Sequence, residues 1–127
     1  LQALARLYEA IFLVWRGAPG DLGTALNLAT YIEHETRSHR ALHPLAMFAF
    51  ARVQLARRIF GAALEAARVA YQRLAVGPLE EWDEYIRLTL IEALDAQGQQ
   101  AEADPIIEEA FRALVARSMH GRFSRPH

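Results

Sequence analysis

Cysteine and lysine are both absent from this sequence of 127 residues. Without cysteine there is no disulfide, no thiolate-bound zinc and no thiol nucleophile. All 14 basic residues are therefore arginines, and 15 acidic residues balance them to a formal charge of −1. Because nucleic-acid-binding domains carry a basic excess, we expect no nucleic-acid partner.

The sequence also lacks a long apolar run and has few strand-forming residues. No stretch approaches the roughly 18 apolar residues that a membrane span needs, so no membrane association is expected. Valine, isoleucine and threonine are scarce, whereas alanine and leucine, both strong helix formers, are abundant. The first residue is Leu1 and no signal-peptide pattern follows it, which predicts a segment of a larger cytoplasmic protein.

Apolar residues recur at helical spacing along six stretches, which predicts an all-α fold. The expected helices span residues 3–16, 23–37, 44–59, 62–75, 79–97 and 100–118. Asp21 is expected to cap the second helix, and Gly98 is expected to end the fifth in a left-handed conformation. The helix at 44–59 is apolar on most sides, which predicts a central helix buried between neighbours.

An internal repeat relates the three predicted helix pairs. Segments beginning at Gly20, Arg58 and Gly98 each carry a turn followed by small and apolar residues on a new helix. The equivalent small residues of the three segments are Ala25, Ala63 and Ala103. Seven residues further on, the equivalent positions are Ile32, Ala70 and Ala110. Small side chains at this spacing allow two antiparallel helices to approach closely.

The segment 90–110 resembles the tetratricopeptide pattern of L..AL...G...EA......A, with Gly98 between its two helices. The resemblance implies antiparallel helix pairs stacked as a short right-handed solenoid. The repeats would span 1–37, 44–75 and 79–118, with a flexible tail at 119–127. Their spacing exceeds the usual ~34 residues. It is similar to that of lengthened repeats in large bacterial signalling proteins, such as MalT-like regulators and the C-terminal regions of serine/threonine kinases.

Residues suited to catalysis or metal binding do not form a recognised pattern. His34, His39 and His43 lie close together, but their spacing does not match H-E-x-x-H, and we interpret them as solvated residues of a linker. The carboxylates fall on the expected outer faces of the helices. No phosphate-binding glycine loop or serine elbow occurs. We therefore expect no enzyme, no metal and no cofactor.

The concave face of the implied solenoid is the expected site for a protein or peptide partner. By analogy with the family, its inward-facing residues would be Phe48, Arg52, Leu55, Tyr85, Leu88, Glu92 and Asp95. Arg52 would hold an acidic group, while Tyr85 and Phe48 would supply apolar contact. The expected function is non-catalytic binding, as a scaffold or sensor arm of a bacterial signalling protein.

Two other functions remain open from the sequence. The terminal helices carry apolar residues, including Phe12 and Phe111, that would allow two copies to associate as a homodimer through the open ends of the stack. The resemblance to MalT-like regulators would also allow a domain that senses a small ligand.

Overall fold

The computed structural model describes residues 2–73 and 82–124, which form helices joined by short turns and no strand. The helices are α1 (Gln2–Arg16), α2 (Asp21–Thr36), α3 (His43–Ala56), α4 (Phe60–Gln72), α5 (Asp83–Ala96) and α6 (Gln100–Ser124). The prediction of an all-α chain of about six helices is confirmed. The expected start of the fifth helix at residue 79 lies outside the described residues.

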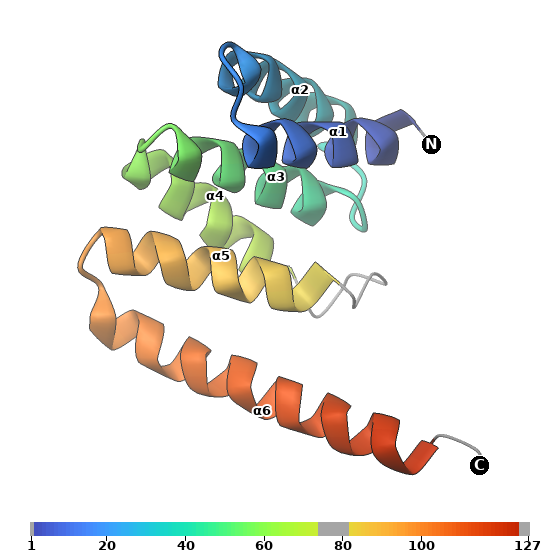
Figure 1. Cartoon of the computed structure of the whole chain (residues 1–127), viewed down its shortest axis with the longest axis vertical. Coiled ribbons are helices and arrows are strands. Elements are labelled where there is room, and N and C mark those ends of the chain that lie inside the picture. Colours follow the sequence, from blue (N-terminus) through green and yellow to red (C-terminus); the bar gives the residue numbers. More distant parts are fainter. Residues whose placement is uncertain (1, 74–81, 125–127) are drawn as a thin grey trace.

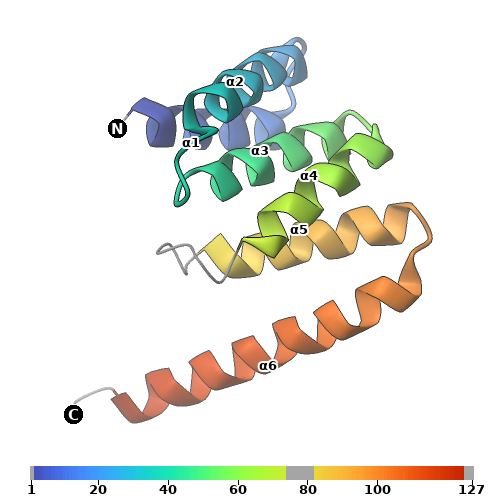
Figure 2. The same ribbon diagram turned by 180° about the vertical axis from the view of Figure 1, so that it is seen from behind.

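The helices form a stack in which each one packs against the helix before it (Figure 1). The first helices of the three pairs also contact one another, α1 against α3 and α3 against α5. These contacts place α1, α3 and α5 in one layer. Seen from either side, α6 diverges from α5 toward its C-terminal end (Figure 2).

Helix α3 is the central element of the stack, as its apolar sequence predicted. It packs against α1, α2, α4 and α5. Its buried residues are His43, Pro44, Leu45, Ala46, Phe48, Ala49, Ala51, Val53 and Gln54. Pro44 fits the first turn of the helix, where backbone N–H groups have no partner within the helix.

The repeat seen in the sequence recurs in the backbone. The first residues of the three aligned segments all have positive φ angles, 85° at Gly20, 65° at Arg58 and 70° at Gly98. The prediction of a left-handed Gly98 is thus confirmed. The three equivalent alanines, Ala25, Ala63 and Ala103, are at most 1% exposed. Their small side chains let the helices of each pair approach closely.

Arg58 occupies a conformation that suits glycine, so Arg58→Gly is expected to raise the free energy of unfolding by about 0.5–1 kcal/mol. The gain is limited because glycine loses more conformational freedom on folding. Chemical denaturation followed by circular dichroism measures it. The converse change, Gly98→Ala, meets open space and is expected to cost about 1 kcal/mol from backbone strain alone. Destabilisation by Arg58→Gly would contradict the assigned turn geometry.

Several helix boundaries differ from the sequence prediction, including the start of α2 and the end of α6. Asp21 does not cap α2 from outside but is its first residue, after Gly20. Its carboxylate accepts two hydrogen bonds from Arg16, at 2.7 and 2.8 Å, which lower its pKa, and a third from the Ala18 N–H. Helix α6 continues to Ser124, so 119–124 is helical and not a flexible tail, because no proline interrupts the helix between Pro105 in its second turn and Ser124.

Candidate functional site

An aromatic cleft of about 540 Å³ opens on the layer formed by α1, α3 and α5, with α6 at its side. Of the residues that the structure describes, seven line this aromatic cleft: Tyr8, Ile11, Phe48, Trp82, Glu84, Tyr85 and Arg117. They come from α1, α3, the start of α5 and the C-terminal part of α6, so the cleft exists only because the stack brings these elements together.

Trp82 is the centre of the aromatic cleft. Its ring lies 5.4 Å from that of Tyr8, 5.6 Å from that of Phe48 and 6.1 Å from that of Tyr85, measured between centroids. The rings are tilted or edge-on, the arrangements that aromatic quadrupoles favour. Trp82 and Phe48 are buried and form the base, whereas Tyr8 and Tyr85 are more than half exposed. The two tyrosines therefore present apolar surface to an incoming group.

Glu84 places a carboxylate at the edge of the cleft. Its Oε2 forms an ion pair with Nη1 of Arg117 at 3.0 Å. Its Oε1 is buried and accepts no hydrogen bond from the described residues. A buried carboxylate oxygen without a donor costs free energy.

A second, smaller hollow of about 160 Å³ adjoins the aromatic cleft at Glu84 and lies between α5 and α6. Leu88, Ala110, Phe111 and Leu114 line the rest of it. Leu88, Phe111 and Leu114 are each more than half exposed. The aromatic cleft and this hollow together form a continuous apolar surface, which we call the inner face.

Ion pairs hold α6 on the stack and so support one wall of the inner face. Arg68 on α4 donates two hydrogen bonds to Glu102, and Arg87 on α5 donates one to Glu109. These bonds lower the pKa of both carboxyls. The Tyr71 hydroxyl also donates to Glu109 at 2.8 Å, and burial and this bond raise the pKa of Tyr71.

The structure brings together only some of the residues predicted for partner binding. Tyr85, Leu88 and Phe48 line the inner face, although Phe48 is buried beneath the tyrosines. Leu55 is half-buried in the core, and Asp95 is exposed in the last turn of α5; neither lines the two hollows. Their positions do not support a direct role in the inner face.

The binding of an acidic group of a partner by Arg52 stays a prediction, and in the structure its guanidinium is already paired with a carboxylate. Its Nη1 donates to Oε2 of Glu92 at 2.9 Å and lies 3.5 Å from the Thr89 hydroxyl. The guanidinium and the Glu92 carboxylate therefore neutralise each other across α3 and α5. The pairing could not be foreseen because the two residues are 40 positions apart in the chain.

The two phenylalanines expected to mediate self-association are both exposed, and that function stays a prediction. Phe12 is 51% exposed on α1, where the Arg16 guanidinium lies 5.5 Å from its ring centroid. Phe111 is 66% exposed but belongs to the inner face beside Leu88. Sequence reasoning did not select Tyr8, Ile11, Trp82, Glu84 or Arg117 as partner-binding residues.

The interpretation of all three histidines as solvated linker residues is wrong for His43. Its side chain is buried at the start of α3, with Nε2 3.2 Å from Glu33 and Nδ1 2.7 Å from Arg73. His34 and His39 are exposed. Across residues 2–73 and 82–124, no three histidine or acidic side chains lie together in a way that could hold a metal ion.

No helix in the described part of the chain combines the length and apolar character required to span a membrane. Comparisons of the sequence with family models and curated proteins, and of the structure with solved structures, find no match.

Proposed function

We propose that this chain is a non-catalytic module that binds a segment of a protein partner on its inner face. The observation that carries the proposal is the aromatic cleft, in which two exposed tyrosines stand over a buried Trp82. Exposed apolar patches rimmed by charge mark interaction sites on folded proteins. In a scaffold or sensor arm of a bacterial signalling protein, as the repeat resemblance suggests, such a face would recruit the partner.

The chemistry of the inner face specifies the kind of segment it accepts. An aromatic or large aliphatic side chain would insert between Tyr8 and Tyr85 onto Trp82, because stacked rings gain contact area without losing hydrogen bonds. A hydrogen-bond donor next to that anchor would reach the Glu84 carboxylate, which lines both hollows of the inner face. The ligand is therefore a peptide with an apolar anchor beside a donor group.

Peptides selected by display against the whole chain test this function. They are expected to carry an apolar anchor next to a donor side chain. Tyr85→Ala is expected to weaken the affinity for these peptides by about 30-fold, the loss typical of an aromatic hot spot. The chain has two tryptophans, so a Trp15→Phe background leaves Trp82 as the single fluorescent reporter of binding.

Tyr31→Ala is the matched control for Tyr85→Ala. Tyr31 is also an exposed tyrosine, but it lies on α2 and lines neither hollow of the inner face. Tyr31→Ala should leave peptide affinity unchanged. Equal weakening by the two substitutions, or selected peptides that do not change Trp82 fluorescence, would refute binding at the inner face.

A further inference from the structure

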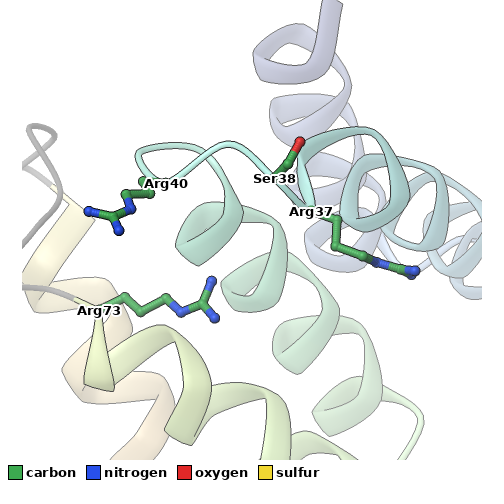
Figure 3. Close-up of a pocket in the computed structure, with 4 residues that line it drawn as sticks. All are labelled: Arg37, Ser38, Arg40 and Arg73. Carbon is green, nitrogen blue, oxygen red and sulfur yellow. The ribbon is translucent and has the colours of Figure 1, made fainter.

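A basic hollow of about 520 Å³ lies away from the inner face, and no described residue lines both. Its lining residues are Arg37, Ser38, Arg40 and Arg73 (Figure 3). Arg37 follows the end of α2, Ser38 and Arg40 lie on the connection to α3, and Arg73 follows the end of α4. The basic hollow thus joins two helix pairs of the stack.

Hydrogen bonds to neighbouring side chains fix two of the three guanidiniums that line the basic hollow, those of Arg37 and Arg73. Arg37 donates to both oxygens of Glu33, at 2.7 and 3.1 Å, and Figure 3 shows its side chain extending away from that of Arg73. Arg73 donates to Nδ1 of His43 at 2.7 Å. Because a guanidinium can only donate, Nδ1 must accept, and Nε2 of His43 then donates to Glu33.

The charges at the basic hollow do not cancel. Glu33 is the one carboxylate in this network, and its two oxygens are taken up by Arg37 and His43. Arg73 is held by a neutral imidazole, not by an acid, and Arg40 forms no ion pair with a described residue. Among the described residues, three guanidiniums against one carboxylate leave about two positive charges around the hollow.

We propose that the basic hollow binds a phosphate monoester. Such a group carries about −1.5 to −2 charge at neutral pH, which matches the excess, and presents oxygens that guanidinium groups bind in a bidentate way. Arg40 and Arg73 would hold the phosphoryl oxygens, whereas Figure 3 shows the Ser38 hydroxyl directed away from both guanidiniums. The volume leaves room for the organic group that carries the phosphate.

Titration of the whole chain with phenyl phosphate, followed by NMR at constant ionic strength, tests the site. We expect saturable shifts that include the Arg73 side chain. Benzoate has the same ring and one negative charge, and it should bind at least about 10-fold more weakly than phenyl phosphate. Arg40→Ala should weaken the binding of phenyl phosphate by about 10-fold. Arg112→Ala, which removes an exposed arginine far along α6, is the control and should change nothing.

Two outcomes would overturn the proposal. One is equal binding of phenyl phosphate and benzoate; the other is equal weakening by Arg40→Ala and Arg112→Ala, which would indicate diffuse surface charge. A phosphoserine tripeptide distinguishes the sources of the phosphate. Tighter binding of the tripeptide identifies a phosphorylated protein segment as the ligand, and tighter binding of the free ester identifies a small molecule.

Discussion

Replacing Leu94 with alanine is expected to lower the free energy of unfolding by about 3 kcal/mol. Leu94 is fully buried on α5, in a cluster that includes Leu64 from α4, Leu90 from α5 and Ile106 from α6. Truncation removes apolar contacts and leaves a cavity that a close-packed stack fills only in part. Urea denaturation followed by circular dichroism measures the loss, which is large against a total of about 5–15 kcal/mol.

Leu88→Ala provides the matched control on the same helix. Leu88 is 51% exposed on the inner face, so its truncation should cost less than about 0.5 kcal/mol. Similar losses at Leu88 and Leu94 would mean that the stack does not bury α5 in the register described.

Acidification is expected to remove about 2 kcal/mol of stability through Glu33. Hydrogen bonds from Arg37 and His43 lower the pKa of its carboxyl from 4.5 to about 2. Because the folded pKa lies below the unfolded one, the contribution is complete above about pH 5 and disappears as pH falls from 4.5 toward 2. The full shift in the pKa of Glu33 would correspond to about 3 kcal/mol of stability. Solvent screening at the largely exposed Arg37 reduces this contribution.

Glu33→Gln separates this contribution from those of other carboxyls with lowered pKa values, such as Asp21 and Glu109. Unfolding of wild type and variant is measured by urea denaturation at several pH values between 2 and 7. The difference between the two proteins should be largest at neutral pH and should shrink toward pH 2. A difference that is constant with pH would show that Glu33 is not held as an ion in the native state.

The helices and their repeat could be predicted from local pattern. Helical periodicity identifies a buried stripe without knowledge of the partner, and small residues such as Ala25 and Ala63 mark close helix contacts. The left-handed turn at Gly98 follows from the residue type itself. Arg58 shows the limit of that reasoning, because the repeat alignment and not its own chemistry points to the turn.

The inner face could be predicted only in outline. Tyr85 and Leu88 were identified because they lie on the first helix of a pair. The place of Trp82 beneath Tyr8 depends on contact between α1 and the start of α5. The ion pair of Glu84 with Arg117 depends on the course of α6 after the Gly98 turn. Periodicity within one helix carries no information about these distances.

Packing between neighbouring helices has a consequence for how this chain folds. Most interhelical contacts join segments adjacent in the sequence, so few long loops must close before contacts form. Chains with such local topology fold within microseconds to milliseconds, and a helix pair can order before the rest of the stack. Because α6 contacts only α5 closely along its backbone and diverges from it, we expect opening of the described stack to begin there. One wall of the inner face would therefore open before the rest of the stack.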